Sequence, residues 1–344
     1  MRSSKHPVLK AICVSLIFVL AVAAVSAALL LQWAPRYNDA PQRASLAGTV
    51  DTLYSGVSSF LYGLVPSVID ETLGTTSYNV SGLSMTFYGR KALLEKELAR
   101  NPADTVYMEV TAETFVANQD FEGVEGDVYL LPRLDSFRER WDYFRKHISL
   151  DDMETAFSLN IFLAGRYWKD ILLDHQDIDR VYADNGFVPF VHKNVALSPE
   201  KAASSRDKNT LDVDFKEENL RAFRENIEYC QAQGAKVVLV YIPISDQFIW
   251  KNSNWDELNE NFIELAAETG CDFYNFNLLR NRFSILNDTE SFYDEDHMCE
   301  TGARSFSAAF ADVMQKARSG EDVSSLFYAS YEEMKQDSPY AAML

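Results

Sequence analysis

The chain has 344 residues with 47% hydrophobic content, which is enough for a large folded domain and excludes a disordered polypeptide. Its formal net charge is −19, and the part that follows Lys10 carries −22, since three basic residues and no acidic ones lie up to that point. Such an acidic protein has no general field that attracts phosphate, so we expect no nucleic-acid partner.

The N-terminal region predicts a membrane anchor. A basic tail at 1–10 precedes an uncharged apolar segment at 11–33, and about 20 such residues cross a bilayer as a helix. The positive-inside rule then keeps the tail cytoplasmic and the rest outside, which makes a single-pass protein of the cell membrane. A cleaved signal peptide is the alternative, because 24–27 has small residues suited to cleavage, but the apolar run continues beyond them.

Residues 34–49 are polar, contain two prolines and predict a linker. The stretch 50–319 predicts an α/β domain, because short β-branched or aromatic runs alternate with segments of helical spacing. This alternation is typical of a doubly wound, flavodoxin-like parallel sheet of about five strands. The expected strands are 49–54, 77–80, 104–110, 235–242 and 271–276, and the expected helices are 60–73, 83–100, 215–234, 256–269 and 301–318.

One long region interrupts the alternation. We interpret residues 112–210 as a mostly helical insertion over the sheet, a candidate cap, with helices at about 133–147 and 151–174. The acidic run at 174–179 contains His175 and is compatible with a metal site, but a polar helix end is favoured, and we expect neither metal nor cofactor. The tail at 320–344 has no periodicity that predicts an element.

Three cysteines follow the apolar segment, and their spacing matches no zinc or redox motif. A disulfide between Cys271 and Cys299 is one interpretation. Free buried thiols at these two positions and at Cys230 are the favoured one.

Candidate catalytic residues lie where strands of this sheet would end, which is where ligands bind in such folds. Ser58 lies in the turn after the first strand, and Asp294 and His297 share a loop before the last helix. A serine esterase needs a hydroxyl nucleophile, an imidazole that takes its proton and a carboxylate that orients the imidazole. The backbone amides of Ser58 and Gly82 are the candidate oxyanion donors.

This arrangement resembles the SGNH (GDSL-type) hydrolase superfamily over about 50–110 and 215–318. The likeness rests on a turn motif after the first strand, a glycine after the second and an Asp-x-x-His before the last helix. Bacterial membrane-anchored members look most similar, including the D-alanyl transfer protein of teichoic-acid operons and exopolysaccharide O-acetylation proteins. The matching residues are Gly56-Val57-Ser58, Gly63, Pro66, Gly82, Asp294-x-x-His297 and Gly302-Ala303.

The resemblance implies that Ser58 is the nucleophile, His297 the base and Asp294 the orienting acid. Ser59 and Asp296 are the alternatives for the first and last of these roles. It further implies an esterase or acyltransferase outside the cytoplasm, acting on acyl groups of a surface glycan or wall polymer. A membrane acyltransferase is a candidate partner.

Two departures from the family pattern motivate a second hypothesis. Val57 stands where the family has Asp, and the run 109–114 contains no Asn that would donate to the oxyanion. The alternative function is a non-catalytic accessory or binding component of a surface-glycan assembly or acylation system.

Overall fold

The computed structural model describes residues 7–32, 38–117, 126–127, 129–148, 182–190 and 202–343. A five-stranded sheet in the order β2-β1-β3-β5-β7 is parallel throughout. This is the flavodoxin-like order, so the predicted α/β fold with a five-stranded parallel sheet is confirmed. The strands are β1 (Thr52–Ser55), β2 (Ser77–Asn79), β3 (Thr105–Glu109), β5 (Lys236–Tyr241) and β7 (Asp272–Asn275), and β4 (Asn209–Thr210) pairs separately with β6 (Asn252–Ser253).

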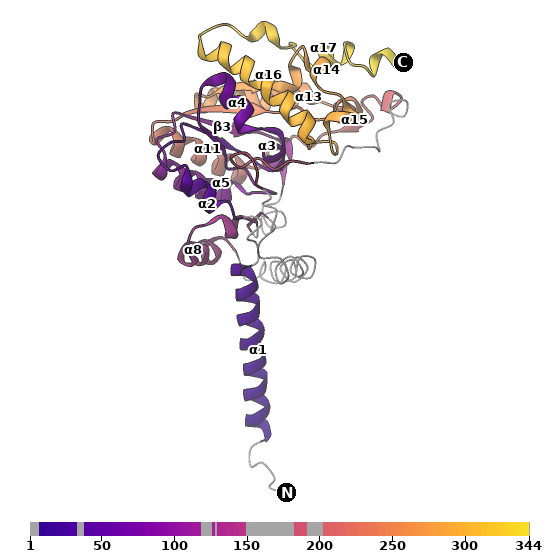
Figure 1. Cartoon of the computed structure of the whole chain (residues 1–344). Coiled ribbons are helices and arrows are strands. Elements are labelled where there is room, and N and C mark those ends of the chain that lie inside the picture. Colours follow the sequence, from indigo (N-terminus) through magenta and orange to yellow (C-terminus); the bar gives the residue numbers. More distant parts are fainter. Residues whose placement is uncertain are drawn as a thin grey trace.

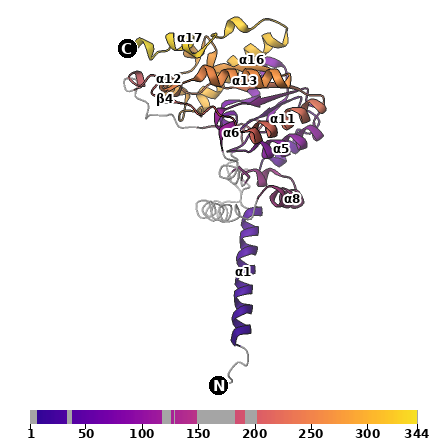
Figure 2. The ribbon, with the colours of Figure 1, turned by 180° about the vertical axis from the view of Figure 1, so that it is seen from behind.

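Helices cover both faces of the sheet (Figures 1 and 2), and a hydrophobic cluster lies on each side. One face carries α3 (Ser58–Gly63), α4 (Pro66–Leu73) and α16 (Glu300–Arg318), and the other carries α5 (Phe87–Arg100), α11 (Glu217–Ala232) and α13 (Trp255–Thr269). Besides α1, which is described below, the domain has the helices α2 (Ala40–Ser45), α6 (Ala112–Val116), α8 (Phe137–His147), α12 (Asp246–Lys251), α14 (Arg282–Ile285), α15 (Asp288–Ser291) and α17 (Tyr331–Gln336), with 3-10 turns η2 (Leu131–Arg133), η3 (Phe276–Leu278), η4 (Ser324–Leu326) and η5 (Ala341–Met343).

Strand β5 shows why the sheet forms. Its residues after Lys236 are all buried, and successive side chains enter opposite clusters, Leu239 on one face and Val240 on the other. A strand buried on both faces needs a continuous apolar run, which is what the sequence provides.

Two helices differ from the prediction near the site. The expected helix at 60–73 is two helices, because Pro66 at the start of α4 favours an extended Val65 before it. Helix α5 begins at Phe87 rather than at 83, where the Thr86 hydroxyl accepts from Gly89 N–H at 3.0 Å and caps the helix. In both cases a local feature of the backbone, a proline or a capping hydroxyl, sets the helix boundary, and the apolar spacing does not show it.

The linker prediction is wrong for residues 40–45, which form α2. Arg43 of this helix is buried, with its Nη1 2.5 Å from the carboxylate of Glu97 and its Nε 3.0 Å from that of Asp39. Arg133 of η2 donates to Asp39 at 2.7 Å, and Arg43 also donates to the Arg133 carbonyl. Buried charges must be paired, so this cluster ties the chain to the domain from Asp39 onward.

Residues 11–32 of the predicted anchor lie in α1 (Pro7–Gln32), a 26-residue helix that projects from the body of the molecule (Figure 1). In a search of the described part of the chain, no helix proves long and apolar enough to cross a membrane. The membrane anchor is therefore not confirmed and stays a prediction.

The predicted insertion and tail are described in part. The first helix expected in the insertion, at about 133–147, corresponds to η2 and α8. The second, at 151–174, lies outside the described residues. The tail, which predicted no element, contains α17, whose Tyr331 stacks on Trp255 at 5.3 Å. Aromatic residues scattered without a period gave no signal for this packing.

Cys230, Cys271 and Cys299 are free thiols. Cys230 and Cys299 are buried, and Cys271 is partly buried. The alternative of a disulfide between Cys271 and Cys299 is therefore wrong.

Helix α16 follows the loop that carries His297. At Gly302 this helix packs closely against the backbone of Ser291, at the end of α15. A Cβ at Gly302 would lie 2.1 Å from the Ser291 carbonyl oxygen, so Gly302→Val must move backbone. We expect a loss of about 1–3 kcal/mol in the free energy of unfolding, measured by chemical denaturation. Ala308→Val, at an exposed position of the same helix, is the control. Equal stability of the two variants would contradict the close packing.

Candidate active site

Ser58 is the first residue of α3 and follows the turn that ends β1. Its Oγ lies 2.7 Å from Nε2 of His297, across 239 residues of sequence. Parallel strands place their carboxyl ends at one edge of the sheet, which is why the turn after β1 meets the loop before α16. Ser58 is half-buried, and the 2.7 Å contact puts its hydroxyl within hydrogen-bond reach of a base.

The loop at 293–297 holds the imidazole through the Asp294 carboxylate. Both oxygens of Asp294 lie 2.9 Å from His297 Nδ1. Oδ1 also accepts from the backbone N–H of His297 at 2.8 Å and of Asp296 at 3.2 Å. Asp294 thereby closes its own loop and fixes the ring, so that Nδ1–H donates to the carboxylate and Nε2 can accept from Ser58.

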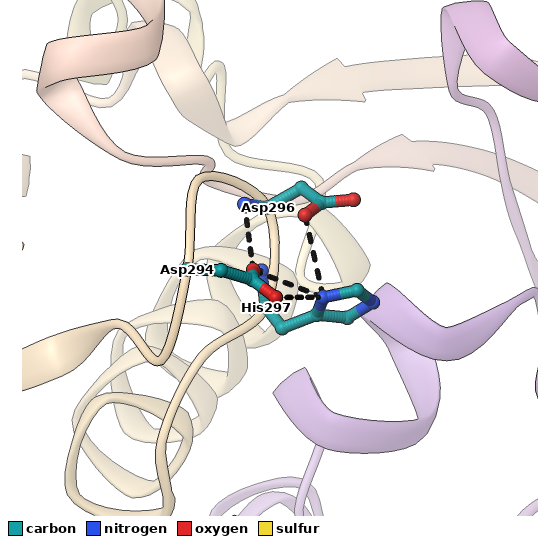
Figure 3. A group of neighbouring side chains, drawn as sticks. All are labelled: Asp294, Asp296 and His297. Atoms are coloured by element: carbon teal, nitrogen blue, oxygen red, sulfur yellow. Dashed lines mark hydrogen bonds and ion pairs between the residues drawn. The ribbon is translucent and has the colours of Figure 1, made fainter. Parts of the chain in front are cut away.

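A second carboxylate reaches the same ring nitrogen. Asp296 Oδ1 lies 3.3 Å from Nδ1 of His297, and Figure 3 shows the two aspartates on the same side of the ring. Sequence reasoning treated Asp294 and Asp296 as alternatives. The structure brings both to the imidazole, with Asp294 closer.

The three groups shift one another's pKa values. Burial raises the pKa of Asp294, but the hydrogen bond and charge of His297 outweigh it and lower the value to about 2. Burial raises the pKa of Asp296 to about 7, against the lowering effect of His297. Burial lowers the pKa of His297, but the hydrogen bond to Asp294 and the charges of both aspartates raise it overall. The site therefore favours an imidazolium beside an ionised Asp294, the charge state that forms when His297 takes a proton.

Glu109, which sequence reasoning did not assign, positions the nucleophile turn. It ends β3, and its buried carboxylate accepts from Val57 N–H at 2.6 Å and from the Ser59 hydroxyl. It also packs against Gly56, where a Cβ would lie 2.2 Å from Oε2. A carboxylate at the end of an otherwise apolar strand was the available signal, because that end of the sheet faces the site.

The two adjacent serines therefore have different surroundings. Ser59 is buried and donates to Glu109, whereas Ser58 faces His297. The geometry favours Ser58 over the alternative Ser59 as nucleophile.

The predicted oxyanion donors are not equally placed. Gly82 N–H donates to the Gly56 carbonyl at 3.3 Å, so in this structure the amide is engaged by backbone. The prediction that Gly82 faces a developing oxyanion does not match this contact. Ser58 N–H, at the start of α3, is the remaining predicted donor.

Aromatic side chains and a small cavity flank the serine. Tyr62 packs edge-on against the His297 ring with centroids 5.4 Å apart, and Phe190 stacks on Tyr293 at 4.4 Å. Phe190 belongs to 182–190, a described part of the predicted insertion, which thus borders the site. A cavity of about 160 Å³ lies beside Ser58 and Glu109, and apolar residues and carboxylates share its lining.

Among the described residues, Asp294, Asp296 and His297 also form the group whose ligand atoms lie close enough for a metal, within 4.8 Å. Both ring nitrogens already have partners, Asp294 at Nδ1 and Ser58 at Nε2. The arrangement matches a nucleophile, base and acid in series better than a metal cage. The run at 174–179, considered above for metal, lies outside the described residues.

The chain matches no family model, and no curated protein matches it. It is similar in structure to a GDSL-like lipase from Bacteroides thetaiotaomicron VPI-5482, with 12% identity and a TM-score of 0.38 over 81% of this chain and 96% of that one. An acetyl xylan esterase from Geobacillus stearothermophilus gives 12% identity and a TM-score of 0.34 over 77% and 95%. Likenesses this distant do not establish an activity.

Glu109 is testable as a positioning residue. Glu109→Ala leaves Val57 N–H without its acceptor and releases the start of α3, so we expect kcat/KM for p-nitrophenyl acetate to fall about 10²-fold. Glu109→Gln keeps an acceptor for Val57 and a donor for Ser59, and should restore most of the activity. Equal loss in both variants would show that the carboxylate has another role.

The pH dependence follows from His297. Only the neutral imidazole accepts the Ser58 proton, so kcat/KM should fall as the pH drops through a His297 pKa raised above its ordinary 6.5. Asp296→Asn removes an anion that raises this pKa, and the acid limb of the profile should move to lower pH. Glu295→Gln is the matched control, because Glu295 pairs with Lys251 at 2.6 Å instead. An unmoved limb in Asp296→Asn would contradict the assignment.

Proposed function

We propose that this protein is a serine esterase or acyltransferase in which Ser58, His297 and Asp294 form the catalytic triad. The observation that carries the proposal is the continuous chain of contacts, 2.7 Å from Ser58 to His297 and 2.9 Å from His297 to Asp294. Three residue types required for acyl transfer meet here from two loops that are far apart in sequence.

The reaction follows from these contacts. Ser58 Oγ attacks the ester carbonyl carbon while its proton moves to His297 Nε2, and the carbonyl electrons move to oxygen. The tetrahedral intermediate collapses, the alcohol leaves with the proton from His297, and an acyl group remains on Ser58. Water or a sugar hydroxyl then attacks the acyl carbon and gives its proton to His297, which passes it to Ser58 Oγ as the bond between the serine and the acyl group breaks. The ionised Asp294 stabilises the imidazolium in both halves.

The cavity supports a short, uncharged or cationic acyl group. Its volume of about 160 Å³ is below the usual range of ligand pockets and suits an acyl group of few carbons. Glu113 and Asp212 contribute carboxylates to its lining, and an anionic acyl group would be repelled there. The stacked Phe190 and Tyr293 beside His297 offer an aromatic surface for the alcohol part, such as a sugar ring of a surface glycan or wall polymer.

A location outside the cytoplasm is part of the proposal. It is supported by the uncharged segment 11–33, by the exposed apolar side chains described in α1 and by the basic residues before that segment. The substrate would then lie near the membrane, and a membrane acyltransferase that supplies acyl groups remains a candidate partner.

The non-catalytic alternative rested on Val57 and on the missing Asn. Val57 contributes its backbone N–H to Glu109, which any residue except proline can do, so its side chain is not an obstacle to catalysis. The contact between Ser58 and His297 favours the enzyme.

The proposal is tested with a fluorophosphonate probe and p-nitrophenyl acetate on the full chain. Ser58→Ala should abolish labelling, and His297→Ala should lower kcat/KM by roughly 10⁴- to 10⁶-fold. Ser59→Ala, one residue away, should still be labelled, because the Ser59 hydroxyl faces Glu109 and Ser58 keeps its own. Absence of labelling in the unmodified protein, or labelling that survives Ser58→Ala, would refute the proposed nucleophile.

A further inference from the structure

Helix α8 presents aromatic side chains to solvent on its outer face. Phe137 is 60% and Trp141 54% exposed, one helical turn apart, whereas most other large apolar side chains that the structure describes outside α1 are buried. Arg138 and Arg145 flank them with side chains 91% and 72% exposed, and the two share one exposed counter-charge, Asp142, at 3.8 and 3.9 Å. Exposed aromatic residues beside arginines are typical of helices that lie in a membrane interface.

The inner face of α8 fixes this surface to the domain. Tyr143 is buried, and its hydroxyl donates to Asp127 at 2.6 Å. Ser136 and Glu139 form a capping box at the helix start. The exposed aromatics are therefore held on a folded helix.

The chain path places α8 close to α1. Helix α1 ends at Gln32, and Asp39 is already bound to Arg133 in the buried ion cluster. The residues between Gln32 and Asn38 span at most roughly 20 Å even when fully extended. Arg133 ends η2, and α8 begins four residues later, at Phe137; Figures 1 and 2 show α8 beside the end of α1.

The charge of α8 opposes that of the rest of the domain. The helix carries four arginines and lysines against two acidic residues, in a segment of the chain with a net charge of −22 after Lys10. An acidic domain is repelled by anionic lipid, and a basic helix at the end of α1 would offset that repulsion locally. Charge complementarity thus selects anionic lipid headgroups as the partner.

We propose that the outer face of α8, with Phe137, Trp141, Arg138 and Arg145, binds the headgroup region of an anionic bilayer. This contact rests on the proposed anchoring by α1 for its reach. It gives the domain a second attachment beside α1 and fixes the orientation of the catalytic edge relative to the membrane.

The test is lipid quenching of tryptophan emission. The full chain is reconstituted in vesicles of phosphatidylglycerol and a phosphatidylcholine brominated near the headgroup end of its chains. Trp141→Phe should lose a share of the quenching. Adding Ile263→Trp restores the tryptophan count at an exposed position of α13, on the far side of the body from α1 (Figure 1), and should not restore the quenching. Arg138→Glu with Arg145→Glu should reduce quenching of Trp141 in the same vesicles.

The outcomes separate this proposal from the others. Unchanged quenching in Trp141→Phe overturns the contact and leaves α8 as a surface for a protein partner. If alkaline carbonate removes the chain from vesicles while Trp141 is quenched before the wash, anchoring by α1 fails and the α8 contact stands. A chain that does not float with vesicles at all overturns both. Hydrolysis of p-nitrophenyl acetate should be unchanged in every α8 variant, because α8 lies outside the triad. Unchanged hydrolysis shows that the variant is folded, and it tests the proposed esterase activity independently of lipid binding.

Discussion

The Glu109 carboxylate joins the ends of two neighbouring strands, since it belongs to β3 and accepts from the N–H of Val57 just beyond β1. Burial raises its pKa against the opposing effect of Arg90, whose guanidinium donates to the Glu109 carbonyl at 3.1 Å. A buried acid is costly unless its oxygens are occupied, and here two donors from one turn occupy them. Strand β3 of the sheet thereby determines the conformation of the turn after β1.

This constraint also separates two chemically equal hydroxyls. Because Glu109 takes the hydrogen bond of Ser59, the Ser59 side chain is drawn into the domain, and Ser58 at the preceding position is directed outward to His297. On the opposite side Asp294 organises its loop with backbone hydrogen bonds, as Glu109 does for the turn. Each half of the site is therefore held by a carboxylate that bonds main chain, and the halves meet at one contact of 2.7 Å.

The sequence was informative where chemistry repeats along the chain. The alternation of apolar runs gave five strands in the right places, and the order of Ser58, Asp294 and His297 relative to them gave the residues that the structure brings together. It failed for pairings between distant residues that belong to no motif. Nothing local shows that Arg43 and Asp39, in a polar stretch, pair with Arg133, or that Gly82 N–H is taken by Gly56. Such pairings depend on the finished fold.

The buried ion cluster changes the geometry that follows from an anchor. A flexible linker from 34 to 49 would let the domain rotate and sample a wide shell above a bilayer. With the chain fixed from Asp39 onward, only the few residues after Gln32 remain to join α1 to the body, and η2 with Arg133 becomes the base of the domain. Under the proposed anchoring by α1, a base this close to lipid must carry charge compatible with the headgroups, or it is repelled by them. In a domain this acidic, the arginines and exposed aromatic side chains of α8 would provide positive charge and apolar contact at the base of the domain.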